Sequence, residues 1–464
     1  MAIPARGVTG ANGPAIERDR LTALLAAERR SYADRNPRSR AAAAASGSLL
    51  GGVPMTWMAK QAGGFPIYLH GAAGARVTDV DGHELVDFCL GDTGAMAGHS
   101  PGPTVAAVTQ RLAALGGATT MMPTEDAALV AAELARRFDV ARWSFALSAT
   151  DANRWALRIC RAVTGRPRVL VNSYCYHGSV DETLVVAHEG TARSRPGNVG
   201  APCDPALTSR VVEFNDAEAL ERELAHGDVA AVLMEPALTN VGIVLPEPGY
   251  LEDVRRLTRD AGVLLVNDET HTISAGPGGC TQAWGLEPDV VTVGKAIGGG
   301  IPAAAFGLTE EIAAAVTARQ DLDLIDTGGV GGTLAGNALS LAAMRATLSE
   351  VLVDEAFEQM ILLGDAYATG VERMIAAHEL PWSVAQLGAR AEFRFVRPAP
   401  RNGTQSNLAA DDELDDFLHL YLLNRDVLLT PFHNMALMCP ATTSADVELL
   451  LDTLDAAVQT VPWQ

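Results

Sequence analysis

The spacing of hydrophobic and polar residues changes several times along the chain and divides it into segments. From Ala15 to Asp34, charged and apolar residues follow a helical spacing, and a polar stretch rich in arginine and alanine continues to about Ser48. We interpret residues 1–50 as an N-terminal arm and linker. Residues 51–100 contain short apolar segments broken by glycine pairs and by Asp81-Gly82, a hairpin-turn signal, and they predict a small meander of strands.

Through the middle of the chain, helical stretches alternate with short apolar runs, which predicts a mainly parallel sheet covered by helices. The clearest runs cover residues 169–173, 230–236, 262–269 and 290–295. Glu235, Asp268 and Lys295 are polar residues that close three of these runs. Ligands of such folds bind beyond the carboxyl ends of the strands, so we expect a site there. We assign residues 101–334 to this large α/β domain.

The C-terminal part mixes helices and strands. We predict a helix that begins near Asn337, a loop around residues 401–407, and a closing helix from Ser444 to Val458. Residues 335–464 are expected to form a smaller α+β domain together with residues 51–100. A chain of 464 residues exceeds the size at which one core stops growing, which agrees with two domains.

Composition narrows the classes of partner. The formal net charge is -21 and no basic stripe offsets it, so we expect neither nucleic acid nor a membrane surface as a partner. The six cysteines are scattered without metal-ligand spacing, and we expect no disulfide framework and no metal site. We find no signal-peptide pattern and no apolar stretch of membrane-spanning length, and we expect a cytoplasmic protein.

Lys295 stands out because of its surroundings. It closes the apolar run VVTVGK and precedes AIGGGIPAAAFG, where little side-chain bulk would obstruct a flat ligand. An amine in such a place can be desolvated, which favours the neutral form that Schiff-base chemistry needs. Asp268 could hold a ring nitrogen in its protonated form. The plainer alternatives are a solvated lysine and a helix-capping acidic pair, Asp268-Glu269.

The segments VNDETHTISAGPGG and PDVVTVGKAIGGGIPAAAFG resemble the core signature of the class III aminotransferases. These are pyridoxal 5'-phosphate (PLP) enzymes of fold type I, with a mainly parallel sheet in the large domain and a smaller α+β domain. The chain is most similar to the branch of glutamate-1-semialdehyde aminomutases and β-amino-acid transaminases. The resemblance implies that Lys295 forms the Schiff base with PLP and that Asp268 contacts the pyridine nitrogen.

Two further motifs carry the same resemblance. Ser148-Ala149-Thr150-Asp151-Ala152 is similar to the family's Ser-Gly-Thr-Glu-Ala turn, which implies a phosphate cradle at Ser148, Ala149 and Thr150, with alanine in place of the usual glycine. Without the family, this segment is a plain N-cap. Tyr176 and His177 resemble the family's Tyr-His-Gly segment, which implies that Tyr176 stacks on the PLP ring and His177 supports it. The alternative is a half-buried structural pair.

Other expected cofactor-site residues are more weakly defined. Glu235 and Asn240 resemble a Glu-Pro…Asn segment with supporting roles, although Asn240 suits a surface turn equally well. Thr333, in GGTLAGN, resembles the residue that reaches the partner's phosphate, which implies a homodimer with the active site at the interface. His271 departs from the common Asp-Glu-Val pattern. It could hydrogen-bond or tune Asp268, or be a satisfied buried histidine.

The candidate substrate residues come from the small domain. Trp57, with Met55, lies in a segment that lines the pocket in the family, but such a pair is also typical of a core. Arg390 and Arg394 could bind a carboxylate, or could lie on a solvated face of their strand. The late loop with Phe432, His433 and Asn434 could also approach the pocket.

The sequence therefore predicts an enzyme that moves an amino group from an amine or β/ω-amino acid to pyruvate or 2-oxoglutarate. Lys295, once released from PLP, would act as the base. The nearest alternative is an intramolecular aminomutase, of the glutamate-1-semialdehyde 2,1-aminomutase kind, or an epimerase. Consumption of a second keto substrate separates the two. A non-catalytic binding protein on the same fold is the third reading.

Overall fold

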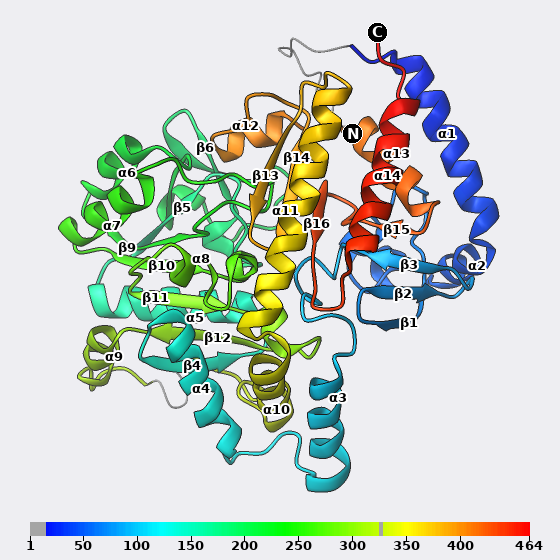
Figure 1. Ribbon diagram of the computed structural model, residues 1–464. Coiled ribbons are helices and arrows are strands. Elements are labelled where there is room, and N and C mark those ends of the chain that lie inside the picture. Colours follow the sequence, from blue (N-terminus) through cyan, green and yellow to red (C-terminus); the bar gives the residue numbers. More distant parts are fainter. Residues whose placement is uncertain (1–14, 324–327) are drawn as a thin grey trace. The chain divides into compact units, whose positions relative to one another are not determined.

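A computed structural model describes residues 15–323 and 328–464, which fall into two compact units (Figure 1). Of the described residues, 15–100, 359–400 and 408–464 form unit 1, and 101–323, 328–358 and 401–407 form unit 2. The division after residue 100 coincides with the predicted one. The second division lies between Glu358 and Gln359, whereas the sequence predicts it at residue 334.

Unit 2 is built on a seven-stranded sheet in the order β4-β12-β11-β10-β9-β5-β8. Strand β12 is antiparallel to both of its neighbours, and the others run parallel to one another. The strands are β4 (Arg142–Ala146), β5 (Arg168–Asn172), β8 (Ser209–Val212), β9 (Val229–Met234), β10 (Leu264–Asp268), β11 (Val290–Val293) and β12 (Ala304–Leu308). The mainly parallel sheet is confirmed, and the four predicted runs are β5, β9, β10 and β11. Strands that are buried on both faces need a continuous apolar sequence, which is why these four strands could be predicted from the sequence.

Helices and short hairpin strands complete unit 2. The α-helices are α3 (Gly102–Thr109), α4 (Glu125–Phe138), α5 (Ala149–Thr164), α6 (Ala217–Leu224), α7 (Tyr250–Asp260), α8 (Gly279–Ala283), α9 (Glu310–Thr317) and α10 (Ala338–Ala346). Shorter or irregular turns are η3 (Gln110–Leu115), η4 (Asp181–Thr183), η5 (Pro205–Leu207), η6 (Thr272–Ala275), η7 (Lys295–Gly298) and η8 (Thr347–Val351), and the hairpin is β6 (Val185–His188) and β7 (Thr191–Ser194). Helix α11 (Asp354–Ala377) begins in unit 2 and continues into unit 1.

Side-chain contacts explain why unit 2 extends beyond residue 334. The Ser340 hydroxyl donates to the carbonyl of Pro302 at 2.8 Å, and the hydroxyls of Thr104 and Thr347 lie 2.8 Å apart. Residues 401–407 also differ from the prediction, because much of the expected loop is helix α12 (Gly403–Leu408). The hydroxyl of Thr404 donates to Glu213 at 2.5 Å, which fixes this segment to unit 2.

Unit 1 contains two small sheets. Strands β1 (Leu69–Ala73), β2 (Arg76–Asp79) and β3 (Glu84–Asp87) form the expected antiparallel meander, and β15 (Val427–Leu428) adds to β3 in parallel. The turn between β2 and β3 uses Gly82 at φ +96°, as the Asp-Gly pair predicts. The second sheet is β13 (Ser383–Leu387), β14 (Arg390–Arg394) and β16 (Met435–Leu437). Its helices are α1 (Arg18–Arg35), α2 (Pro37–Ala45), α11, α13 (Asp412–Leu423) and α14 (Ser444–Thr460), with the short turns η1 (Leu50–Gly52) and η2 (Thr56–Ala59).

The N-terminal arm is a packed part of unit 1. Helix α1 buries Leu21 and Leu25, and Arg29 pairs with Asp416 of α13 at 2.9 Å. The predicted linker is wrong over most of its length, because α2 occupies it. Pro37 at the first helical position and the alanine run after it both favour a helix.

The described part of the chain contains no helix that combines the length and apolar character needed to cross a membrane.

Arg137 is a buried cation that ties α4 to the rest of unit 2. It contacts Glu133 at 2.7 Å and donates to the carbonyls of Leu348, Leu352 and Pro277 at 2.7, 2.9 and 3.1 Å.

We expect Arg137→Met to destabilise unit 2 by about 3 kcal/mol, because these acceptors lose their partner. Arg136→Met is the matched control, since Arg136 binds the same Glu133 from an exposed position, and should cost less than about 1 kcal/mol. Urea unfolding midpoints measure both, and equal shifts would contradict the expectation.

Candidate functional site

Asp268 is the centre of a buried polar cluster at the carboxyl end of β10. Its Oδ2 accepts a hydrogen bond from Asn153 Nδ2 at 2.7 Å and lies 2.9 Å from His177 Nδ1. Its Oδ1 accepts from the backbone N–H of Thr270 at 3.1 Å. Asn153 in turn accepts from the Thr292 hydroxyl of β11 at 2.6 Å. The cluster therefore joins α5, β10, β11 and the segment after β5.

The two members of the Asp268–His177 pair have oppositely shifted pKa values. Burial would raise the pKa of Asp268, but the hydrogen bond and charge of His177, with Thr270 and Asn153, lower it to about 2. Burial would likewise lower the pKa of His177, but Cys175 and Asp268 raise it well above its ordinary value. These shifts favour the ionised form of Asp268 and the protonated form of His177. A fixed buried carboxylate suits a protonated ring nitrogen, as the resemblance implies.

Glu269 follows Asp268 but has a different role. It accepts hydrogen bonds from the N–H groups of Thr281 and Cys280 at 2.6 and 3.0 Å and from the Thr272 hydroxyl at 2.5 Å. These bonds hold the loop after β10 against the first turn of α8. Burial raises the pKa of this carboxyl group. The helix-capping reading thus describes Glu269 and not Asp268.

Glu235 lies one residue beyond β9 and is also buried. It accepts a hydrogen bond from the hydroxyl of Thr239, and burial raises its pKa. Within the described residues, its Oε1 and His177 Nε2 are buried without a hydrogen-bond partner. Asn240 donates to the carbonyl of Tyr174 at 3.0 Å and so supports the segment that carries Tyr176.

Lys295 lies two residues beyond β11 in a constrained backbone. Its φ of +51° is left-handed, a conformation that non-glycine residues adopt at a cost. A Cβ on the preceding Gly294 would lie 3.1 Å from the Cβ of Ala149, so a larger residue here would require Ala149 to move by a few tenths of an ångström. Lys295 Nζ lies 2.6 Å from His271 Nε2. His271 is half-buried and contacts this lysine, a partner that neither of our readings of His271 included.

Helix α5 begins at the place where we expect the phosphate cradle, and the cradle itself stays a prediction. The Ser148 hydroxyl caps the helix, since it accepts from the N–H of Asp151 at 3.2 Å, which confirms the N-cap. The first N–H groups of the helix remain available to an anion, as at any helix N-terminus. Thr150 Oγ1 accepts from the N–H of Ser179 at 3.2 Å. A Cβ on Gly178 would lie only 2.0 Å from that oxygen, so a larger residue at position 178 would displace Thr150.

The residues present fit PLP. They offer a buried carboxylate for the ring nitrogen, a helix N-terminus for the phosphate and an amine for the aldehyde. Tyr176 is 43% exposed, whereas His177 is buried, so the two do not form a half-buried pair. Thr333 is exposed, and its role across a dimer interface stays a prediction. No group of side chains with metal-ligand character occurs in the described ranges.

The candidate substrate residues all belong to unit 1. Trp57 and Met55 are 41% and 55% exposed, so the core reading is wrong for them. Arg390 and Arg394 are buried, so the reading of a solvated face is wrong as well. Their contribution to substrate binding stays a prediction.

A buried polar network surrounds the two arginines of β14. Arg390 donates to the Thr93 hydroxyl, and His433 Nδ1 lies 3.1 Å from Glu392. Asn434 Nδ2 donates to Asp415 at 2.6 Å, and burial raises the pKa of Asp415 to about 7. The neighbouring Phe432 is partly exposed, and the ammonium of Lys60 lies 4.9 Å from its ring centroid.

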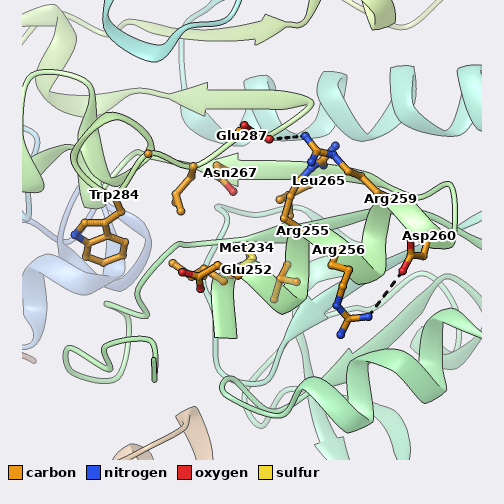
Figure 2. A pocket seen from close by; sticks show the side chains of 14 residues that line it. Met234, Glu252, Arg255, Arg256, Arg259, Asp260, Leu265, Asn267, Trp284 and Glu287 are labelled. Atoms are coloured by element: carbon orange, nitrogen blue, oxygen red, sulfur yellow. Dashed lines mark hydrogen bonds and ion pairs between the residues drawn. The ribbon is translucent and has the colours of Figure 1, made fainter. Parts of the chain in front are cut away.

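Unit 2 also has a cavity of about 400 Å³ beside α7, between Trp284 at one end and Arg256 with Asp260 at the other (Figure 2). Asn267 lines it, and because side chains alternate along a strand, Asp268 points to the opposite face of the sheet. Its arginines are matched by carboxylates, as in the Arg259–Glu287 pair at 2.5 Å. This cavity therefore lacks the unpaired positive charge of a phosphate site.

Comparisons with known proteins agree with the geometry. The family model described as Aminotransferase class-III matches residues 57–458. A glutamate-1-semialdehyde 2,1-aminomutase of Roseiflexus castenholzii is 34% identical over 382 residues, which cover 80% of this chain and 84% of that protein.

Two solved structures show the same likeness. A glutamate-1-semialdehyde aminomutase from Pseudomonas aeruginosa, crystallised in complex with PMP, has a TM-score of 0.93 and 46% identity, covering 96% of this chain and 99% of that one. A β-phenylalanine aminotransferase from Variovorax paradoxus has a TM-score of 0.83 and 26% identity, covering 95% and 97%.

The Gly178 position gives a direct test of the cradle. We expect Gly178→Ala to weaken PLP binding about tenfold or more, because the new methyl group displaces Thr150 and a hydrogen bond to a charged group contributes about 1.5–3 kcal/mol. Gly190→Ala is the control, since Gly190 has nearly the same φ, +77° against +80°, with no atom within 4 Å of its Cβ. Titration of the cofactor-free proteins with PLP gives the dissociation constants. Equal weakening would mean that backbone strain alone matters.

The Asp268–His177 pair predicts a pH window for stability. The lowered pKa of Asp268 stabilises the fold above its ordinary value of 3.8, and this is lost as pH falls toward 2. The raised pKa of His177 stabilises the fold fully below 6.5, and this is lost as pH rises through the raised value. We therefore expect the Tm difference between wild type and His177→Gln to be largest between pH 3.8 and 6.5. Exposed His226→Gln serves as the control, and a pH-independent difference for His177→Gln would refute the charged pair.

Proposed function

The chain belongs to the class III aminotransferases, a family of PLP-dependent enzymes, and from this membership we propose that it is an intramolecular aminomutase acting on glutamate 1-semialdehyde or a similar amino aldehyde. One observation carries the proposal. The PMP-bound aminomutase resembles this chain over 96% of its length with a TM-score of 0.93. The sequence favours transamination between two molecules, and the relatives support the aminomutase alternative better.

The residues of unit 2 have separate tasks in this proposal. Asp268 would hold the ring nitrogen, the first turn of α5 with Thr150 would hold the phosphate, and Tyr176 would cover the ring. When bound, PLP supplies an electron-poor ring that stabilises the negative charge left when a substrate carbon loses a proton. His177 keeps Asp268 ionised, and Asn153 keeps its carboxylate in one orientation.

Lys295 is the residue that moves protons. Its amine would take a proton from one substrate carbon and deliver a proton to another position, a contribution worth about 10²–10⁴-fold in rate. An amino group that moves between adjacent carbons of one molecule needs proton transfer at both carbons. Because the same carbon skeleton both gives up and receives an amino group, no keto acid is consumed.

We further propose a homodimer in which Thr333 of each chain contributes to the phosphate site of the other. The exposure of Thr333 and its place in the GGTLAGN segment before α10 support this proposal.

Transamination remains the second candidate. The likeness to a β-phenylalanine aminotransferase, at 26% identity over 95% of this chain, favours it. The same residues would serve this reaction, with a keto acid as the acceptor.

The test is to incubate the PLP-loaded protein with glutamate 1-semialdehyde and no keto acid, and to follow the 2,1-shifted isomer over many turnovers. We expect sustained conversion, and a loss of about 10²-fold or more in Lys295→Ala. A parallel panel of β-amino acids with pyruvate or 2-oxoglutarate tests the second candidate. Product formation that stops at one equivalent and resumes only with a keto acid would replace the aminomutase by a transaminase.

A further inference from the structure

We propose that the cavity beside α7 binds a small organic cation, an amine or quaternary ammonium group carried on an apolar body. Three features of its lining carry this inference: an apolar floor, the indole ring of Trp284 at one end, and the carboxylate of Glu252 at the same end (Figure 2). The inference concerns a second site of unit 2 and does not rest on the proposed function.

The size and the floor of the cavity suit a small molecule. Its volume of about 400 Å³ lies within the range of small-molecule sites. Strands β9 and β10 contribute Met234 and Leu265, and α7 contributes Leu251 and Val254, so much of the inner surface is apolar. Small-molecule sites combine such a surface with a few polar groups that fix the orientation of the ligand. The floor therefore favours a ligand with an apolar body.

The arginines of the cavity do not make it an anion site. Arg255 binds Asp289 through two hydrogen bonds, at 2.8 and 3.1 Å. Arg256 binds Asp253 at 2.8 Å, and the third arginine is held by its pair with Glu287. Each lining arginine thus already has a carboxylate partner.

Glu252 is the lining carboxylate that these pairs leave over. It lies on the same face of α7 as Arg255 and Arg256, three and four residues before them, a spacing at which helical side chains pair. Both arginines bind the aspartates named above instead. Within the residues that the structure describes, the Glu252 side chain has no ion pair or hydrogen bond. A carboxylate in this state, at the edge of an apolar cavity, attracts a cation.

Trp284 adds a second attraction for a cation at the same end. Glu252 belongs to the first turn of α7, and Figure 2 shows it at the end of the cavity where the indole lies. Trp284 is 37% exposed, and its segment is fixed by α8, whose Thr281 hydroxyl accepts from Asn267 at 3.1 Å. The π-system of tryptophan attracts positive charge more strongly than that of other side chains. The net charge of -21 on the whole chain acts in the same direction.

The cavity lies across the sheet from the candidate cofactor site. Asn267 lines the cavity, and Asp268 points to the opposite face because side chains alternate along a strand. A suitable probe is therefore a cation that cannot react with PLP. Benzyltrimethylammonium meets this requirement, since its nitrogen carries no hydrogen and cannot form an imine.

The test is isothermal titration calorimetry of the PLP-loaded protein with benzyltrimethylammonium. We expect saturable binding, and binding about fivefold weaker or worse for benzyl alcohol and for phenylacetate. The first shares the phenylmethyl group without a charge, and the second carries it with a negative charge. Equal or tighter binding of either compound would mean that the cavity recognises apolar bulk or an anion. That result would overturn the proposal, as would the absence of saturable binding of the cation.

A pair of matched variants tests the carboxylate. Glu252→Gln should weaken binding of the cation about fivefold or more and leave benzyl alcohol unaffected, because the amide keeps the shape of the side chain and loses its charge. Glu311→Gln is the control, since Glu311 is an exposed glutamate in the first turn of α9 and its removal changes the net charge equally. Thermal unfolding confirms that both variants are folded. Equal weakening by the two variants, or none by Glu252→Gln, would contradict the proposal.

Fluorine NMR locates the bound cation. The sequence contains six tryptophans, and in PLP-loaded protein labelled with 5-fluorotryptophan the signal that is missing from Trp284→Phe belongs to Trp284. We expect benzyltrimethylammonium to shift this signal and to leave the other tryptophan signals in place. A shift confined to another tryptophan, such as the exposed Trp57 of unit 1, would reject the cavity as the site. None of these measurements involves turnover, so failure of the aminomutase test would leave this proposal standing, and the reverse also holds.

Discussion

The charge of Asp268 is the constraint on which the site of unit 2 depends. A carboxylate in a protein interior costs several kcal/mol unless charges and hydrogen bonds compensate it. Compensation here comes from His177 after β5, Asn153 on α5 and the N–H of Thr270. Each partner comes from a different element. The charge of this carboxylate is therefore compensated only when the sheet, helix α5 and the segment that carries Tyr176 are all correctly placed around it.

Two adjacent acidic residues have different roles because their surroundings differ. Asp268 and Glu269 are both fully buried, yet the pKa of the first is lowered and that of the second is raised. The His177 ring faces Asp268, whereas Glu269 faces neutral hydroxyl and N–H donors. One therefore acts through its charge, and the other organises the loop that positions His271.

Much of the fold could be predicted from the sequence because strands buried on both faces need uninterrupted apolar runs. The positions of Asp268 and Lys295 followed, since polar residues that end such runs lie at the ligand-binding edge of the sheet. The unit boundary could not be predicted, because α10 looks the same in sequence whether it packs on one unit or the other. Its place depends on partners such as Pro302.

The hydrogen-bond partners of buried side chains also could not be predicted from the sequence. Asn153 lies 115 residues from Asp268, and the one signal in the sequence is that this polar residue falls on an otherwise apolar face of its helix. For the arginines of β14, the sequence left two readings open, a carboxylate-binding pair and a solvated face. Alternation along the strand suggests a solvated face, but Glu392 and Thr93 allow a charged face to be buried. Contacts between distant segments decide such cases.

The scarcity of lysine has a consequence for an enzyme whose chemistry depends on carbonyl compounds. Aldehydes and PLP condense with any accessible amine, and each unwanted adduct removes reagent or adds bulk to the surface. In this chain the second lysine, Lys60, has its ammonium 4.9 Å from the centroid of the Phe432 ring. Nearly all of its positive charge is arginine, which does not form stable imines. Such a protein should tolerate concentrated aldehydes with little self-modification.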